Sequence, residues 1–290
     1  MTLYVTSSTV AASADTLLRQ ARVSDAMQAL SAQVKQHPAD PAKRVFLFQL
    51  LALMGQWERA ENQLKVAGEL DARNAMMVSA YQLALRGERE RAAVFAGSGN
   101  PTLIGEPSEW HAQLLQAFRW LREGHIAQAL ELRGQAFEAA ETVRGSIDGE
   151  PFEWIADADS RFGPCLEMIV NGAYAWVPFS RFSALRFDAP TDLRDTIWAP
   201  AQITWRNGGE TVGFVPCRYY GSEQSDDAQL MLARRTDWTD CRAANASGSS
   251  PQNGTGSGDD CFIGSGQRML ATDAGEYPLL DVRTLTFDVL

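Results

Sequence analysis

Histidine is scarce in this chain of 290 residues. The three histidines, His37, His111 and His125, all lie in the first half, so the second half has no imidazole for acid–base catalysis or zinc binding. The sequence also contains no P-loop, G-x-S-x-G or H-E-x-x-H motif. These absences exclude the commonest phosphate-binding, nucleophilic and zinc-dependent sites, and we predict no catalytic residue, no metal and no cofactor.

Cysteine is also rare. The four cysteines, Cys165, Cys217, Cys241 and Cys261, are far apart in the sequence and form no C-x-x-C pair. Zinc sites and redox motifs are recognised by closely spaced ligands, and none is present here. We therefore expect four thiols that belong to the core or the surface and have no part in a metal site.

Long hydrophobic runs and an excess of basic charge are missing as well. No apolar run approaches the ~18–20 residues that span a bilayer, and the first residues lack the basic and apolar regions of a signal peptide. The net charge is −10, and most of the acidic excess follows residue 150. Because nucleic acids and anionic membranes attract basic surfaces, we exclude both as partners and expect a cytoplasmic protein.

The first half of the chain has apolar residues at helical spacing, interrupted by Gly55, Gly87 and Gly124. Each of these glycines is followed five residues later by an alanine. Ala26 and Ala60 are separated by ~34 residues, a period typical of stacked helix pairs. The glycines therefore predict tight reversals between paired helices.

The segment 41–74 resembles a tetratricopeptide repeat. The glycine, aromatic, alanine and large apolar positions of that repeat are filled here by Gly55, Trp57, Ala60, Leu64 and Ala67. The resemblance implies stacked helix pairs that expose the first helix of each pair on a concave face. An unrelated helical bundle is the alternative for this part of the chain.

From residue 152 the pattern changes to that of strands. The apolar runs 165–170 and 173–179 are separated by Asn171-Gly172, which predicts a β-hairpin with a type I′ turn. A second hairpin is predicted around the turn 207–209. The remaining expectations are strands at 184–187, 269–270 and 279–287, a loop at 190–195 and a short helix within 227–235.

These patterns predict an α+β protein with two domains. Residues 1–145 form tetratricopeptide-like helical repeats, and residues 150–290 form a small antiparallel β-rich domain. Within the second domain, the segment 242–260 is rich in glycine, serine and asparagine. We predict that it is a flexible surface loop and that its deletion leaves the fold intact.

Paired aspartates in the second half offer the main enzymatic alternative. Asp157 and Asp159 share one face of an extended chain, and together with Asp192 and Asp195 they could form the site of a metal-dependent hydrolase. The nearby arginines Arg161 and Arg194 favour local ion pairs in turns instead. We therefore keep the hydrolase as the alternative function. Asp226 and Asp227 precede a short helix and are expected to cap it.

The second half also holds most of the tryptophans: Trp154, Trp176, Trp198, Trp205 and Trp238. These side chains could form an exposed recognition patch. Aromatic residues of a small β-rich domain more often form its core, and we favour that interpretation.

The repeat register gives a more specific candidate for binding. It places six residues on the concave face, namely Val45, Gln49, Met77, Tyr81, Leu114 and Phe118. Repeats that clamp a peptide carboxylate use lysine and asparagine at the first two positions, which Val45 and Gln49 do not match. A mostly apolar groove suits an amphipathic helix. The alternative is that these side chains pack against neighbouring helices.

Several segments of the second half resemble the ImpE/TagJ family. They are EWIADADSRFGPCLEMIVNGAYAWVPF, PTDLRDTIWAPAQITWRNGGE, SDDAQLMLARRTDW and GQRMLATDAGEYPLLDVRTLTF, which lie within residues 152–240 and 266–287. Members of this family are accessory proteins of the bacterial type VI secretion system. The resemblance implies a non-enzymatic adaptor that binds an N-terminal helix of the sheath subunit TssB and is linked to the ClpV ATPase.

Overall fold

The computed structural model describes residues 13–106, 108–244 and 261–288. The predicted flexible loop at 242–260 lies mostly outside these residues, so its mobility and its tolerance of deletion stay predictions. No helix in the described ranges is both long enough and apolar enough to cross a membrane.

The first part of the chain is helical, as predicted. Its helices are α1 (Ala14–Arg19), α2 (Val23–Gln36), α3 (Pro41–Leu53), α4 (Trp57–Leu70), α5 (Ala75–Ala96), α6 (Glu109–Glu123) and α7 (Ile126–Ala139), with a short turn η1 (Ala72–Asn74) before α5. Local sequence explains their ends. Asp40 accepts a hydrogen bond from the backbone of Lys43 at the start of α3, where Pro41 takes the first helical position.

Two of the three predicted glycine reversals are confirmed. Gly55 (φ 66°) and Gly124 (φ 82°) have the positive φ that suits glycine, and they lie between α3 and α4 and between α6 and α7. The reversal predicted at Gly87 is wrong, because Gly87 lies inside the continuous helix α5. A Cβ atom on Gly87 would lie 2.5 Å from Cγ2 of Ile169, so this glycine allows the helix to approach a strand closely.

The helix pairs α3–α4 and α6–α7 are compatible with tetratricopeptide-like repeats, whereas α5 is a single long helix where a third pair was expected. The likeness to that repeat therefore stays a prediction. The helices end at Ala139 and the strands begin at Gly145. The division into domains 1–145 and 150–290 also stays a prediction.

The second part is built on antiparallel strands. They are β1 (Gly145–Ile147), β2 (Glu150–Phe152), β3 (Ile155–Asp157), β4 (Cys165–Val170), β5 (Ala173–Pro178), β6 (Phe182–Phe187), β7 (Trp198–Trp205), β8 (Glu210–Pro216), β9 (Thr236–Asp240), β10 (Phe262–Gly266), β11 (Met269–Thr272), β12 (Glu276–Pro278) and β13 (Thr284–Phe287). Short helices α8 (Ala228–Met231) and α9 (Cys241–Ala244) and turns η2 (Phe179–Arg181), η3 (Leu193–Thr196), η4 (Ser222–Gln224) and η5 (Leu279–Asp281) connect them. The α+β class is thus confirmed.

The described strands form one eight-stranded sheet in the order β2-β1-β13-β6-β7-β8-β4-β5, with smaller sheets β12-β11-β3 and β10-β9. The predicted hairpin β4–β5 is confirmed: Val170 pairs with Ala173, and both Asn171 (φ 52°) and Gly172 (φ 80°) have positive φ. The second hairpin, β7–β8, is confirmed as well. Asp227 caps α8 as predicted. The segment 279–287 is only partly a strand, because η5 occupies its first residues.

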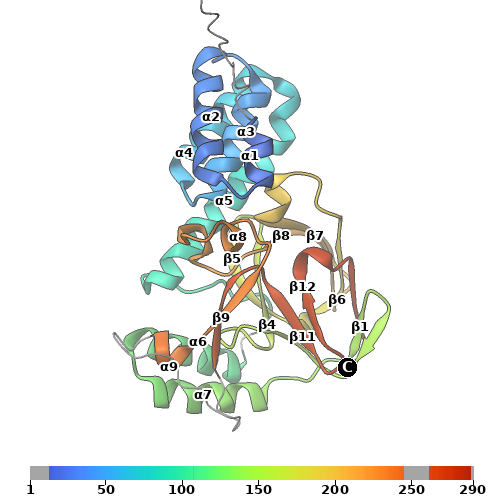
Figure 1. Cartoon of the computed structure of the whole chain (residues 1–290). Coiled ribbons are helices and arrows are strands. Elements are labelled where there is room, and N and C mark those ends of the chain that lie inside the picture. Colours follow the sequence, from blue (N-terminus) through green and yellow to red (C-terminus); the bar gives the residue numbers. More distant parts are fainter. Residues whose placement is uncertain (1–12, 107, 245–260, 289–290) are drawn as a thin grey trace, which may run out of the picture.

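One hydrophobic cluster continues from the helices into the sheet. It joins Leu50 and Phe48 of α3 to Trp176 of β5 and Trp198 of β7, all nearly fully buried. Figure 1 shows the helices α1–α4 at one end of the molecule and the strands beyond them. Most of the predicted aromatic core is confirmed, although Trp154 and Trp238 keep about two fifths of their surface exposed.

Candidate functional site

Helix α5 lies between the helices α1–α4 and the strands (Figure 1), and it contacts β4 and β5. Gly87 and Arg91 are one helical turn apart on α5 and face Ile169 and Glu167, which are two residues apart on β4. The spacing of the two residues along α5 matches the spacing of their two partners along β4, so the backbone of α5 lies close to the sheet.

The predicted groove residue Tyr81 lies in this contact. Its ring packs on Phe48 of α3 and on Trp198 of β7, each at 5.8 Å between ring centroids, and on Phe214 of β8 at 5.3 Å. The guanidinium of Arg194 lies 5.0 Å from the centre of the Tyr81 ring. Burial raises the pKa of Tyr81 to about 12. Tyr81 thus joins α3 to the sheet and does not face an open groove.

The other predicted groove residues are partly buried and partly accessible. Leu114 and Phe118 of α6 are buried, and the Phe118 ring contacts Trp176 of β5 at 5.2 Å. Gln49 of α3 is buried too, whereas Val45 and Met77 are partly accessible. The six residues therefore do not line one open surface in this conformation, and their role in partner binding stays a prediction.

A shallow apolar recess lies beside α5 instead. Its volume is about 300 Å³, and its lining includes Ala80, Leu83, Ile169, Gly172, Val212 and Phe214. Met76, Ala80 and Leu83 follow one face of α5 at helical spacing. Leu83 and Val212, which both line the recess, are 41% and 71% exposed, and Met76, two turns before Leu83 on α5, is 87% exposed.

The aspartates of the hydrolase alternative are engaged in structural contacts. Arg161 donates to Asp159 and Arg194 donates to Asp192, so the predicted local ion pairs are confirmed. Asp195 accepts from the backbone at the start of η3 as part of a capping box. Among the described residues, no group of three or more histidine, cysteine, aspartate or glutamate side chains is placed to hold a metal ion.

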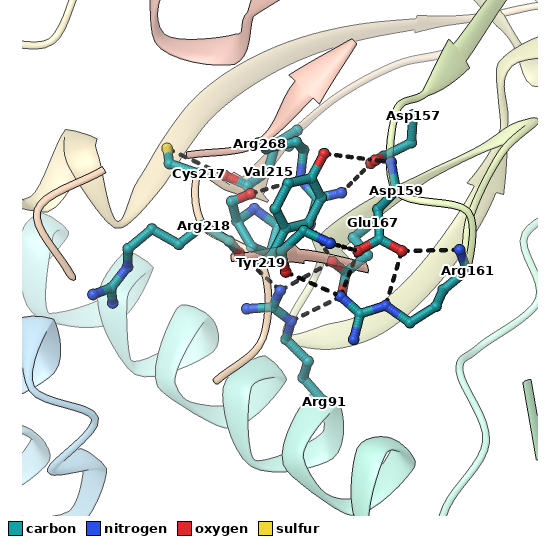
Figure 2. Close-up of polar contacts among 12 residues, drawn as sticks. Arg91, Asp157, Asp159, Arg161, Glu167, Val215, Cys217, Arg218, Tyr219 and Arg268 are labelled. Atoms are coloured by element: carbon teal, nitrogen blue, oxygen red, sulfur yellow. Dashed lines mark hydrogen bonds and ion pairs between the residues drawn. The ribbon is translucent and has the colours of Figure 1, made fainter. Parts of the chain in front are cut away.

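Asp157 belongs to a buried ionic network that the sequence pattern does not predict (Figure 2). Arg268 forms ion pairs with both Asp157 and Glu167. Glu167 also accepts two hydrogen bonds from Arg91 of α5, at 2.8 and 2.9 Å. Tyr174 donates its hydroxyl to the same carboxylate.

All of these side chains are nearly or fully buried. Burial alone would raise the pKa of Glu167, but Arg91 and Arg268 outweigh that effect and lower the pKa to about 2. A carboxylate shared by two arginines in the core holds α5 on the sheet. One signal in the sequence pointed to it: Glu167 is a single charge inside the apolar run CLEMIV, and a buried charge needs partners.

Comparison with known proteins adds the missing context. Residues 149–286 match a family model described as ImpE protein. A protein of Pseudomonas aeruginosa, named type VI secretion system accessory component TagJ, is 47% identical over 279 residues, which cover 96% of this chain and 92% of that protein. The chain belongs to the ImpE/TagJ family. The family match begins near β2 and ends within β13, and the similarity to TagJ includes the helices of the first part of the chain as well.

A solved structure supports the fold of this ImpE/TagJ member. The crystal structure of a Vibrio parahaemolyticus protein superimposes with a TM-score of 0.81, covering 96% of this chain and 98% of the other. The two sequences are 21% identical, so this likeness shows a shared fold alone. The α+β arrangement of helices and strands is thus one that an experiment has found in another protein.

Proposed function

We propose that this protein is an accessory component of a bacterial type VI secretion system. The observation that carries the proposal is the 47% identity to TagJ along almost the whole of both chains. We propose further that it works in the cytoplasm as an adaptor and not as an enzyme. The pairing of Asp159 with Arg161 and of Asp192 with Arg194 supports this view.

The finer proposal concerns the partner. We propose that the protein binds an N-terminal helix of the sheath subunit TssB, and that this links it indirectly to the ClpV ATPase. An amphipathic helix binds by placing apolar residues at positions i, i+3/i+4 and i+7 into a groove. The apolar recess between α5 and β8 has matching chemistry, because its lining is mostly apolar and its rim includes exposed Leu83 and Val212.

We place the partner helix along the exposed face of α5 that carries Met76 and Leu83. The predicted groove residue Met77 is the neighbour of Met76, and Tyr81 supports Phe214 from below. Phe214 lines the recess. In this arrangement, part of the predicted set shapes the surface without touching the partner.

We expect a synthetic peptide of the TssB N-terminal helix to bind the full chain saturably. Burial of apolar surface should give a negative heat-capacity change, measured by calorimetry at several temperatures. Backbone resonances of α5 and β8 should shift during the same titration. If neither heat nor shifts appear with a folded protein, the proposal of TssB binding fails, although membership of the family would be unaffected.

Leu83→Asp and Val212→Asp should each lower the affinity for this peptide by at least about tenfold, because truncating an apolar anchor typically costs on the order of 2 kcal/mol of binding free energy. Both side chains are exposed, so the fold should survive, which the melting temperature checks. Leu103→Asp is the matched control, since Leu103 is 41% exposed like Leu83 but does not line the recess. Unchanged affinity in the two recess variants, together with weaker binding of Val45→Asp, would instead favour the predicted concave groove.

A further inference from the structure

Two cysteines that are far apart in the sequence are neighbours in the structure. Cys241 follows directly after β9, and Cys261 comes directly before β10. These strands pair antiparallel with Asp240 opposite Phe262, so Cys241 and Cys261 are the next opposed pair of the ladder. The backbone N–H of Cys241 donates to the carbonyl oxygen of Cys261 at 2.9 Å, which confirms this register.

The two side chains also meet. Both are buried, at 0% and 2% exposure, and they pack in one small cluster with Leu121 of α6 and Ala129 of α7. Figure 1 shows α9, which begins at Cys241, beside α7. The thiols form a hydrogen bond with each other. Within the described ranges, no disulfide joins them.

We propose that Cys241 and Cys261 are a dithiol that forms a reversible disulfide by exchange with a low-molecular-weight disulfide. Directly opposed residues of an antiparallel pair have Cα atoms ~4.5–5.5 Å apart. A disulfide requires ~4.4–6.8 Å. The bond therefore needs a change of side-chain rotamers and no large movement of the strands, and it would join the two ends of the segment 242–260.

The electrostatics favour Cys261 as the attacking thiol. The hydrogen bond from Cys241 lowers the pKa of Cys261, and the charge of Arg133 on α7 acts in the same direction. The same hydrogen bond raises the pKa of Cys241. Thiolates near a cation are the reactive form in thiol–disulfide exchange. At Cys165 and Cys217 burial is the largest effect, and it raises the pKa of each thiol.

The exchange proceeds in two balanced steps. The Cys261 thiolate attacks one sulfur of oxidised glutathione, forming a mixed disulfide and releasing one glutathione thiolate. Cys241 then loses its proton to solvent and attacks the Cys261 sulfur, which closes the Cys241–Cys261 bond and releases the second glutathione thiolate. The two protein thiols lose two electrons, and one disulfide becomes two thiols.

Access to the buried pair comes from local opening. The sheet β9–β10 has two strands, and residues Asp237 to Thr239 of β9 are exposed. Isolated two-stranded ladders are marginally stable, so such a ladder opens at low cost compared with the main sheet. We therefore expect the exchange to be slower than that of an exposed thiol but to reach completion in the native protein.

The test uses the full, reduced chain incubated with oxidised glutathione under native conditions, then alkylated and digested with trypsin. Cleavage after Arg235, Arg242 and Arg268 puts the two cysteines on separate peptides. We expect one cross-linked pair, 236–242 joined to 243–268, while Cys165 and Cys217 are alkylated. The melting temperature should rise by several degrees on oxidation and return with reductant, because the cross-link restricts the unfolded chain.

Two variants sharpen the result. The double variant Cys165→Ser/Cys217→Ser should give the same cross-link, and Cys241→Ser should stop at a stable mixed disulfide on Cys261. The proposal is wrong if Cys241 and Cys261 of the native wild-type chain are both still reduced, and therefore alkylated, after incubation. It is also wrong if the mixed disulfide persists without ring closure, or if Cys165 or Cys217 is cross-linked instead. The wild-type mapping decides this even if a variant fails to fold.

Discussion

Glu167→Ala should lower the free energy of unfolding by about 3–5 kcal/mol, the usual cost of removing one partner of a buried ion pair. The substitution leaves Arg91 and Arg268 in the core without the carboxylate that both contact. It also removes the acceptor of the Tyr174 hydroxyl. Urea unfolding at neutral pH measures the loss.

Glu61→Ala is the matched control for this experiment. Glu61 of α4 forms an ion pair with Arg89, but its side chain is 38% exposed. Exposed pairs contribute about 0–1 kcal/mol, so this variant should unfold almost like the wild type. A loss below about 1 kcal/mol in Glu167→Ala would show that the buried network is dispensable.

The same carboxylate predicts a dependence on pH. Its pKa is lowered from an ordinary 4.5 to about 2 in the folded protein. The folded state therefore binds fewer protons than the unfolded chain between these values. The stabilisation is fully present above pH ~4.5 and is lost as the pH falls toward 2, and this part of the acid sensitivity should be missing in Glu167→Gln.

Gly87→Val should destabilise the protein by about 2–3 kcal/mol, as overpacking of a filled core does. A Cβ at this position would lie 2.5–2.8 Å from three side-chain carbons of Ile169, which is itself only 1% exposed. The new side chain must therefore push α5 away from β4 and strain the contact between Arg91 and Glu167.

Gly134→Val on α7 is the control, since a Cβ there meets nothing within 4 Å. Valine favours a helix more than glycine does, so this variant should be as stable as the wild type or slightly more stable. A double-mutant cycle tests the mechanism: combined with Ile169→Ala, Gly87→Val should cost at least about 1 kcal/mol less than the sum of the single changes. Additive costs would mean that the two positions do not meet.

Local structure could be predicted well from the sequence because it depends on neighbouring residues. Asn171-Gly172 needs only its own backbone preference and the apolar runs beside it to form the β4–β5 turn. Gly55 and Gly124 at helix ends likewise depend on a local backbone preference, the positive φ that glycine tolerates. Asp159 and Asp192 likewise form ion pairs with arginines two residues along the chain, as local sequence predicts.

Contacts between distant segments were not predictable in the same way. The pattern around Gly87 predicts a reversal, since the sequence cannot distinguish a glycine that turns the chain from one that allows close approach of a strand. The partners of Glu167 lie on α5 and just before β11, at Arg91 and Arg268. Nothing in the spacing of Cys241 and Cys261 shows that a two-stranded ladder brings them together.

The predicted groove illustrates the same limit. The repeat register predicts that Tyr81 and Phe118 lie on the concave side of their helices. In a free-standing array of repeats that side is open, whereas here rings of Trp198 and Trp176 cover it. The recess beside Leu83 depends on β8, which no helical register can describe.

The attachment of α5 to the sheet has a consequence for how this family could change in length. Arrays of repeats commonly gain or lose whole units, because each unit contacts only its neighbours. Here an added helix pair is tolerable only ahead of α1, because α1 and α3 also contact the second part of the chain, at Arg234 and Arg218. A pair inserted between Gly87 and Arg91, or any shift of these two positions relative to β4, would separate Arg91 from Glu167. Length variation among relatives should therefore be concentrated ahead of α1, and the spacing of residues 87 and 91 should be fixed.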